Sequence, residues 1–599
     1  MAARSQPIPT ATDHAVSSTD SAPSTLVDVL RNRASAESLR TAYTFLGNGD
    51  ADETDVCYAD LDRRARAIAA RLQAEYPAGE RILLLLSTGP EYVAAFFGCL
   101  YAGLIAVPAY PPRRNQSLDR IESIVADAQP VAALTTASSL SQLAALAAET
   151  PGFEHLHWHA VEEIGDEAAD RWRAPTVVPE SLAFLQYTSG STRAPRGVMV
   201  SHRNVLHNAE ISAQMFQLSP ADVGVTWLPL YHDFGLIGGI LQPLCIGFPV
   251  VLLSPMTFLH RPLRWLQSIS RYGATLSGSP PFALDHCVRR IRPDERDGLD
   301  LSTWKALALG GEPIHPEVLD RFVEAFGPYG FRREALCTGY GLAEATLFFS
   351  AVAPGTAPTV ATVDSMALEQ HRAIPEPAES SEGKPLVACG RTVEGQRLAI
   401  VEASTGERCA DGEVGEVWIA GPSVAQGYWN RPDESAEVFG AHLSDGDGPY
   451  LKTGDLGFMH DGDLYISGRL KDLIVIRGRN HYPQDVEWTA KQSHPALADG
   501  AGAAFSVERD GEERLVIAHE IGRSWLGDSV SEIVWAIRGA IAEHHDLEVE
   551  EVVLVHPGSL PRTSSGKIRR QASRRAMLEG ALRTWTGRVR RSPVAAART

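Results

Sequence analysis

Residues 182–204, LAFLQYTSGSTRAPRGVMVSHRN, join an apolar run of strand length to a stretch of glycine, hydroxyl and arginine side chains. Residues 188–192 offer hydroxyl groups and a backbone that a ligand can approach closely, and Arg193 and Arg196 add fixed positive charge. This combination suits a flexible polyphosphate. The alternative is a polar connection between a strand and a helix.

The stretch is not the most common phosphate-binding loop. That loop has the pattern G-x-x-x-x-G-K-S/T, whose lysine opens a helix and whose hydroxyl binds Mg²⁺. Gly190 and Gly197 are too far apart for this pattern, and Val198 follows the second glycine. Phosphate binding therefore needs support from the rest of the chain.

Apolar runs of strand length recur on both sides of this stretch, and segments with helical spacing lie between them. This alternation predicts parallel sheets covered by helices, so residues 25–380 are interpreted as doubly wound α/β. The runs are RILLLLS (81–87), PVAALTT (130–136), LAFLQYT (182–188), PVVLLS (249–254) and ALALGG (306–311).

The uncharged segment 92–110, YVAAFFGCLYAGLIAVPAY, is long enough to suggest a transmembrane helix, which needs about 20 residues. Gly98, Gly103 and Pro108 divide it, however, into a short buried helix and a short buried strand. We therefore expect no transmembrane segment.

The sequence changes in character near residue 384. Residues 384–468 contain short strands separated by glycine turns, which predicts a small antiparallel or barrel-like unit. Residues 473–585 mix strands with an amphipathic helix and are expected to form a small α+β domain. The predicted fold class is therefore α/β, with a large N-terminal domain of doubly wound sheets (25–468) that includes the barrel-like unit, followed by the small C-terminal domain.

Composition narrows the possible functions. The 55 Lys and Arg residues stand against 74 Asp and Glu residues, and the net charge of −19 argues against nucleic acid as the main partner. The 7 cysteines form no C-x-x-C pair, so we expect neither a zinc site nor a disulfide framework, and a cytoplasmic location fits. Residues 1–24 lack the apolar stretch of a signal peptide and are expected to be a disordered tail.

Four further segments give the first stretch a context. They are LPLYHDFGLIG (228–238), GYGLAEAT (339–346), YLKTGDLG (450–457) and LPRTSSGKIRR (560–570). In this order and at this spacing, the five segments resemble the adenylate-forming enzymes, which include acyl-CoA synthetases, adenylation domains of peptide synthetases and luciferases. The resemblance extends over residues 25–580.

The resemblance implies that the chain uses ATP and Mg²⁺, and it implies roles for individual residues. The implied ATP contacts are Thr188, Ser189, Gly190, Ser191, Thr192 and Arg193 at the phosphates, Gly311, Glu312 and Tyr340 around the adenine, Asp455 at the ribose, and Gly341 and Arg469 as further contacts of the same nucleotide. Glu344 would help to hold Mg²⁺. Lys567 would reach the substrate carboxylate and the α-phosphate, and His232 would line the pocket beside that carboxylate.

These residue types suit the chemistry that the resemblance implies. A carboxylate attacks the α-phosphorus of ATP, and because both partners are anionic, Mg²⁺ and Lys567 would offset the charge that develops. No general base is needed, and positioning supplies much of the remaining acceleration. Two loop positions depart from the family, because Arg196 replaces its usual lysine and Arg193 replaces a usual glycine.

Each assignment has a plainer alternative. Lys567 begins an arginine-rich segment and would then be one solvated cation among many. Asp455 would cap a turn beside a glycine, and Glu344 would be an acidic residue in the first turn of a helix. His232 and Asp233 together suggest a metal site or a catalytic dyad, but no further cluster of ligands accompanies them in the sequence.

Three features resemble the fatty acyl-AMP ligase branch of these enzymes. They are Arg193 in the loop, Asp233 after His232, and NHYPQDVE at residues 480–487. Extra residues within about 351–388 form an insertion. In that branch such an insertion packs against the small domain and limits its movement, whereas the plainer interpretation is a tolerated surface loop.

The branch implies that a fatty acid becomes a fatty acyl-adenylate with release of pyrophosphate. The acyl group then passes to the phosphopantetheine thiol of a separate acyl carrier protein, in lipid metabolism or in polyketide and nonribosomal peptide biosynthesis. Two alternatives are a fatty acyl-CoA synthetase that uses free CoA and a nucleotide-binding pseudoenzyme that docks carrier proteins.

The two steps imply movement of the small domain. Lys567 must leave before a thiol can enter, so residues 469–472 are expected to act as a hinge at Lys471, and the small domain to be mobile. The basic tail, residues 586–599, would attract an acidic carrier protein or simply be solvated.

Overall fold

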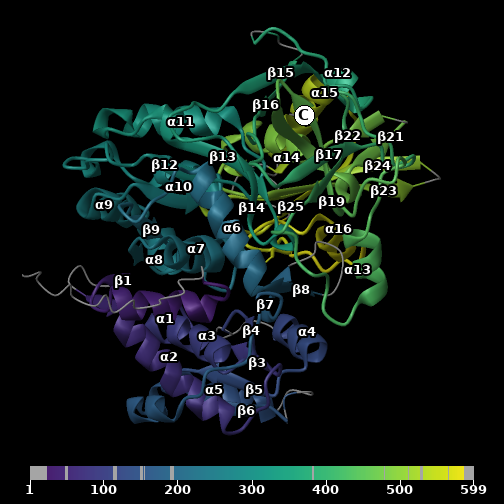
Figure 1. Cartoon of the computed structure of the whole chain (residues 1–599). Coiled ribbons are helices and arrows are strands. Elements are labelled where there is room, and N and C mark those ends of the chain that lie inside the picture. The colour runs from purple at the N-terminus through teal and green to yellow at the C-terminus, as the bar shows by residue number, and fades with distance from the viewer. Residues whose placement is uncertain are drawn as a thin grey trace, which may run out of the picture.

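The computed structural model describes residues 23–47, 52–111, 118–148, 153, 155–188, 195–378, 380, 383–477, 479–509, 512–525, 530–563 and 566–585. Two large sheets with helices around them form most of the chain, and smaller sheets follow toward the C-terminus (Figure 1). The predicted α/β fold class, with its separate small C-terminal α+β region, is confirmed.

The first large sheet has six strands in the order β6-β5-β3-β4-β7-β8, and all its neighbours are parallel except β7 and β8. Its strands are β3 (Arg81–Leu84), β4 (Ile105–Pro108), β5 (Ala132–Thr135), β6 (His157–Ala160), β7 (Leu182–Thr188) and β8 (Arg196–Ser201). The helices of this region are α2 (Tyr58–Gln73), α3 (Pro90–Tyr101), α4 (Asp119–Ala128) and α5 (Ala137–Ala148).

The second large sheet has eight strands in the order β14-β13-β12-β11-β9-β10-β1-β2, with antiparallel pairs only at its two edges. Its strands are β1 (Thr41–Leu46), β2 (Glu53–Cys57), β9 (Gly224–Thr226), β10 (Val250–Leu252), β11 (Leu276–Ser279), β12 (Ala306–Leu309), β13 (Leu336–Gly341) and β14 (Phe348–Ala351). The associated helices are α1 (Leu26–Ala36), α6 (His202–Met215), the π-helix Phe234–Leu241, α7 (Gln242–Ile246), α8 (Pro255–His260), α9 (Leu263–Tyr272), α10 (Phe282–Arg290) and α11 (Pro316–Phe326).

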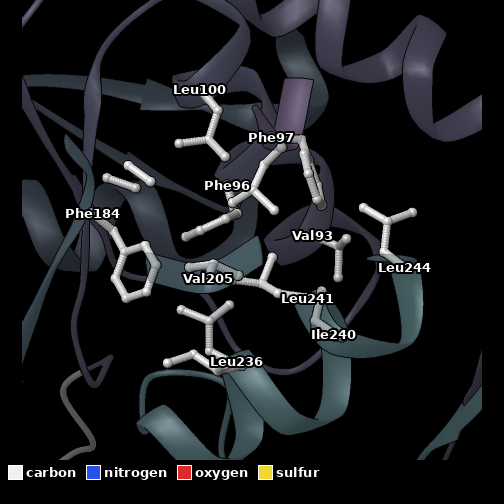
Figure 2. Close-up of a cluster of buried hydrophobic side chains, with 14 of the residues drawn as sticks. Val93, Phe96, Phe97, Leu100, Phe184, Val205, Leu236, Ile240, Leu241 and Leu244 are labelled. Carbon is white, nitrogen blue, oxygen red and sulfur yellow. The ribbon is translucent and has the colours of Figure 1, made fainter. Parts of the chain in front are cut away.

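Helix α3 packs into a shared apolar core. Figure 2 shows Phe96 and Phe97 of α3 close to Phe184 of β7 and to side chains of α6 and the π-helix. The rings of Phe96 and Phe184 meet edge to face, with centroids 5.7 Å apart. Segment 92–110 therefore forms the expected helix and strand, and none of the described helices is both long and apolar enough to cross a membrane.

The antiparallel unit expected after residue 384 is a four-stranded sheet in the order β17-β18-β19-β20. A separate two-stranded sheet, β15 with β16, lies in the predicted insertion. These elements are β15 (Val360–Asp364), α12 (Ser365–Glu369), β16 (Gly383–Val387), β17 (Arg397–Val401), β18 (Gly415–Ala420), α13 (Pro432–Phe439), β19 (Leu451–His460) and β20 (Asp463–Arg469).

The C-terminal region has a core of its own, because helices cover a three-stranded sheet in the order β23-β24-β25 and their buried residues pack on one another. Figure 1 shows this region beside α12, β15 and β16. Its elements are β21 (Ile474–Ile476), β22 (Arg479–His481), α14 (Pro483–Gln492), β23 (Gly502–Arg509), β24 (Glu512–Glu520), α15 (Val530–His545), β25 (Val549–Val555) and α16 (Arg570–Leu578).

The shared core predicts a large effect of Phe96→Ala on stability. The Phe96 side chain is fully buried, so its removal leaves a cavity and should lower the free energy of unfolding by about 3–5 kcal/mol in a urea titration. Leu39→Ala is the control, because Leu39 is 86% exposed and its loss should change little. Equal effects of the two variants would contradict this packing.

Candidate active site

Tyr340, Asp455 and Arg469 form a hydrogen-bonded row that joins β13 to the antiparallel sheet. The Tyr340 hydroxyl donates to Asp455 Oδ2 at 2.7 Å, and Arg469 Nε donates to Asp455 Oδ1 at 2.8 Å. Asp455 is buried, and its charge raises the pKa of Arg469. Each carboxylate oxygen keeps a second lone pair, so Asp455 is oriented by the protein and can still accept hydrogen bonds from a ligand.

Lys567 lies beside the turn that follows β12. Gly311 in this turn has a φ of 83°, and Lys567 Nζ lies 3.5 Å from the position that a β-carbon on residue 311 would occupy. The left-handed backbone favours glycine at position 311, and a β-carbon there would be in ordinary contact with the ammonium group.

The charge of Lys567 acts on two carboxyl groups. Burial raises the pKa of Glu312, and Lys567 provides the largest opposing effect. Burial also acts on Asp233, but the charges of His232 and Lys567 bring the pKa of that carboxyl below its ordinary value. His232 Nδ1 lies 2.6 Å from Asp233 Oδ1. The structure therefore gathers His232, Glu312 and Lys567 from three distant segments.

The turn that carries Lys567 is closed by its own hydrogen bonds. Thr563 N donates to the Lys567 carbonyl oxygen at 2.7 Å, and Lys567 N donates to Thr563 Oγ1 at 3.0 Å. Next to this turn, Arg562 Nη2 lies 2.6 Å from Glu520 Oε2 of β24. These bonds fix the backbone of the turn, and the Lys567 side chain is half-buried.

Arg570, three residues beyond Lys567, is an important residue that the sequence did not reveal. It donates to both carboxylate oxygens of Glu487 in α14, at 2.7 and 2.8 Å, and to Asp472 Oδ2 at 2.8 Å. Glu487 and Asp472 are far from Arg570 in the sequence, so no local spacing could have indicated these ion pairs.

The expected hinge lies close to this network. Lys471 is exposed within the short turn that links β20 to β21, and Asp472, one of the two carboxylates that bind Arg570, is the next residue. The turn therefore joins an exposed residue to a buried ion pair.

Glu344 sits in a second polar group, near the hydrogen-bonded row of Tyr340, Asp455 and Arg469. Tyr428 OH donates to Glu344 Oε1 at 2.8 Å, and burial raises the pKa of Glu344. Arg196 lies over the Tyr428 ring, 5.0 Å from its centroid, and Arg196 Nη2 lies 2.6 Å from Glu434 Oε1. Arg196, which replaces the family's usual lysine, therefore already has a carboxylate partner.

The two ends of the glycine-rich loop are brought together. Thr188 ends β7, Arg196 begins β8, and the two residues pair across this antiparallel ladder. The predicted phosphate contacts Ser189, Gly190, Ser191, Thr192 and Arg193 lie outside the described residues.

Gly341 is the remaining predicted nucleotide contact. It ends β13 and packs so closely on the Leu347 carbonyl oxygen that a β-carbon would clash there. Its place beside Tyr340 is that of a residue that shapes the backbone of the site.

The insertion contacts the C-terminal region through Glu369 at the end of α12. Arg479 Nε donates to Glu369 Oε2 at 2.6 Å, and His481 Nδ1 lies 3.1 Å from Oε1. Asn480 Nδ2 donates to the Glu369 carbonyl oxygen at 2.9 Å. One residue of the insertion thus binds three consecutive residues that follow the hinge turn.

A second group of contacts lies farther from the hinge turn. Lys384 Nζ of the insertion lies 2.5 Å from Asp485 Oδ2 and 4.3 Å from the centroid of the Tyr482 ring. The rings of His315 and Trp488 stack with centroids 3.9 Å apart, and burial lowers the pKa of His315 to about 4. His315 is therefore neutral in this stack at neutral pH.

The metal interpretation of His232 and Asp233 gains no support from the structure. The described residues contain no group of three or more His, Cys, Asp or Glu side chains that could hold a metal ion. Glu344 is a single half-buried carboxylate, which suits a cation that takes its other ligands from a substrate and water.

Residues 30–429 match the AMP-binding enzyme family, and the chain belongs to that family. Residues 471–586 match the AMP domain of Disco-interacting protein 2-like proteins. The chain is 45% identical to the medium-chain fatty acid–acyl-carrier-protein ligase JamA of Moorena producens, over 95% of this chain and 97% of the relative. It is 37% identical to the long-chain fatty acid–AMP ligase FadD32 of Mycolicibacterium smegmatis, over 91% of this chain and 92% of that one.

A solved structure of similar architecture is the fatty acyl-adenylate ligase of Legionella pneumophila in complex with acyl adenylate and pyrophosphate. It shares 39% identity with this chain, covers 94% of it and 97% of its own length, and superposes with a TM-score of 0.73. The fold and the sequence thus agree that the chain is an AMP-binding enzyme.

The hydrogen-bonded row of Tyr340, Asp455 and Arg469 predicts that Tyr340→Phe weakens the binding of nucleotides. Loss of the hydroxyl leaves Asp455 held by Arg469 alone, and we expect adenosine nucleotides to bind about tenfold more weakly in calorimetry. Tyr101→Phe is the matched control, because it removes a similar bond to Asp62, 2.9 Å long, in a different part of the chain. Equal nucleotide affinity in both variants would argue against a role of Asp455 in binding.

Proposed function

We propose that this protein is a fatty acyl-AMP ligase. It activates a fatty acid with ATP to fatty acyl-adenylate and pyrophosphate, and then passes the acyl group to the phosphopantetheine thiol of an acyl carrier protein. The observation that carries the proposal is the position of Lys567 beside Gly311, where its charge acts on the carboxyl groups of Asp233 and Glu312. The names of the 45% and 37% identical relatives support the fatty acid as substrate.

The first step joins two anions. A carboxylate oxygen of the fatty acid bonds to the α-phosphorus of ATP, and pyrophosphate leaves with the electron pair of the broken bond. Lys567 would hold the carboxylate and the α-phosphate together and offset their charge, while Asp455 would fix the ribose. The carboxylate is already ionised at neutral pH, so the step needs no general base.

Glu344 is the residue proposed to hold Mg²⁺. This ion prefers oxygen ligands and is commonly bound by one or two carboxylates together with substrate phosphates. When bound, it would neutralise phosphate charge. The Tyr428 hydroxyl orients one oxygen of Glu344, and the raised pKa of this buried carboxyl fits a site that is completed by a cation.

The fatty acid is proposed to lie along the π-helix Phe234–Leu241. This helix follows His232 and Asp233 directly, and its residues are apolar or glycine. The Phe234 ring lies against Gly238 and Gly278, where a β-carbon would be in close contact with it. Within this helix only Phe234 and Gly238 are half-buried and the other residues are buried, so an acyl chain whose carboxylate lies near His232 would meet Phe234 and Gly238 first. π-Helical segments often occur at functional sites.

The second step needs a different arrangement of the C-terminal domain. Lys567 occupies the place beside Gly311 that an incoming thiol would have to approach, so this domain is proposed to rotate about Lys471 before transfer. The ion pairs of Arg570 join the Lys567 turn to Asp472 and α14. The turn and the domain would therefore move together.

The insertion favours the carrier protein over free CoA as acyl acceptor. Glu369 and Lys384 tie it to residues that move with the C-terminal domain, so these contacts would oppose a large rotation. We propose that the energy of docking a carrier protein overcomes them, whereas free CoA makes too few contacts to do so.

Lys567→Ala tests the first step. The variant should release pyrophosphate about 100- to 1000-fold more slowly with fatty acids of medium and long chains, because one preorganised charge is lost. Transfer from supplied acyl-adenylate to a phosphopantetheinylated carrier protein should be largely kept, since Lys567 is not needed there.

Lys567→Arg should keep part of the activity, and Arg575→Ala, an exposed arginine of α16, should keep all of it. ATP binding by the unmodified protein without any pyrophosphate release would favour the pseudoenzyme instead.

Glu369→Ala tests the role of the insertion. Loss of the contacts to Arg479 and His481 should raise acyl-CoA formation from free CoA about tenfold, while adenylate formation changes little. Glu376→Ala is the matched control, because Glu376 lies in the same insertion. If the unmodified protein already makes acyl-CoA as fast as it acylates a carrier protein, it is a fatty acyl-CoA synthetase.

A further inference from the structure

Arg120 and Arg569 bring two guanidinium groups to the candidate active site from different domains. Arg120 is the second residue of α4, and Arg569 immediately precedes α16. Arg120 Nη2 lies 3.4 Å from the carbonyl oxygen of Tyr187. Tyr187 precedes Thr188, so Arg120 stands at the beginning of the glycine-rich loop.

Neither arginine has a carboxylate partner in the described part of the chain. Arg569 Nε is shielded from solvent and finds no hydrogen-bond acceptor among these residues. Burial lowers the pKa of Arg120, and the charge of Arg569 lowers it further, so the two charges are near enough to repel one another. Two partly buried cations in this relation favour the binding of an anion.

Neighbouring arginines behave differently. Arg570 binds Glu487 and Asp472, and Arg196 binds Glu434. Among the described residues, carboxylates therefore pair with Arg570 and Arg196 but not with Arg120 or Arg569, whose remaining donors can bind another acceptor. The planar fork of an arginine matches the oxygens of a phosphate group.

The position of the pair indicates which phosphates it would meet. Lys567, two residues before Arg569, lies at Gly311, where the α-phosphate is proposed. Arg120 lies at the start of the loop proposed for the β- and γ-phosphates. A triphosphate that extends from Lys567 toward this loop would bring its terminal phosphates to the two arginines.

We propose that Arg120 and Arg569 bind the β- and γ-phosphates of ATP, and then the pyrophosphate that they become, from the two sides of the domain interface. The proposal rests on the adenylate-forming activity proposed above. As the bond from the carboxylate oxygen to the α-phosphorus forms, the bond from the α-phosphorus to the bridging oxygen breaks. The electron pair goes to pyrophosphate, whose added charge the two arginines stabilise.

The pair also links pyrophosphate release to domain rotation. Arg569 belongs to the C-terminal domain and Arg120 to the large domain, so a rotation that removes Lys567 also separates the two arginines. Pyrophosphate then loses half of its binding site before the thiol arrives. Return of pyrophosphate to the acyl-adenylate is thereby hindered during transfer.

The test measures the reverse reaction, in which acyl-adenylate and inorganic pyrophosphate give ATP and the free fatty acid carboxylate. Arg120→Gln and Arg569→Gln should each raise the KM for pyrophosphate about ten- to hundredfold, because each removes a charged hydrogen-bond donor. The KM for acyl-adenylate and the transfer of the acyl group to carrier protein should stay within about twofold. Arg575→Gln, in α16, is the matched control and should change none of these values.

The Lys variants at both positions separate binding from folding. Arg120→Lys and Arg569→Lys keep the charge and should restore part of the pyrophosphate affinity. An unchanged KM for pyrophosphate in both Gln variants would overturn the proposal. A changed KM for the carrier protein with an unchanged KM for pyrophosphate would also overturn the proposal. That result would assign the two arginines to the phosphate of the phosphopantetheine arm.

Calorimetry with inorganic pyrophosphate keeps the test independent of the proposed activity. If the unmodified protein makes no acyl-adenylate, the proposed function fails, but binding of pyrophosphate that is lost in the double Gln variant would still support the anion site. Equal binding of pyrophosphate by the unmodified protein and the double variant would refute it.

Discussion

The ion pairs of Arg570 with Glu487 and Asp472 determine where Lys567 can lie. They connect three segments of the C-terminal region, namely the turn that carries Lys567, helix α14, and Asp472 next to the expected hinge. Removing one partner of such a buried network leaves an uncompensated charge, which is costly. The network therefore lets the C-terminal domain carry Lys567 as a rigid attachment, and the rest of the site can be built on the large domain.

The site divides its charges between groups that are neutralised within the chain and groups left for substrates. Asp455 is balanced by Arg469, and Arg196 by Glu434. Arg120 and Arg569 have no such balance among the described residues. Because the substrates of adenylate formation carry several negative charges, uncompensated cations are expected where these charges gather.

Much of the fold could be predicted from the sequence because it depends on local patterns. The apolar runs at 81–87, 182–188 and 306–311 became buried strands, and the glycines of segment 92–110 did mark the boundary between a helix and a strand. The family resemblance implied that Tyr340 and Asp455 contact one nucleotide, but it did not indicate the hydrogen bond between them.

The partners of Arg570 could not be predicted, because they lie in distant segments of the C-terminal region that meet only when the chain folds. Those of Glu369 could not be predicted either, because they meet it only when the insertion packs against that region. Arg196 shows a related limit, since its sequence position suggested a phosphate contact while its partner Glu434 lies in α13. A sequence motif identifies a charged residue such as Arg196, but the residue that binds it is decided by tertiary packing.

The contacts of Glu369, Lys384 and His315 with the C-terminal region lie at two different distances from the expected hinge, and this difference affects how they resist rotation. His481 pairs with Ile474, three residues beyond Lys471, so the binding of Glu369 to Arg479, Asn480 and His481 acts close to the expected hinge. Lys384 binds Asp485 and His315 stacks on Trp488, and both of these partners lie in α14, farther along the chain from Lys471. A small rotation would strain the contacts of Lys384 and Trp488 first and leave those of Glu369 nearly intact. The C-terminal domain would thus move only through small angles while both groups of contacts hold, and it would rotate fully only when both groups are broken.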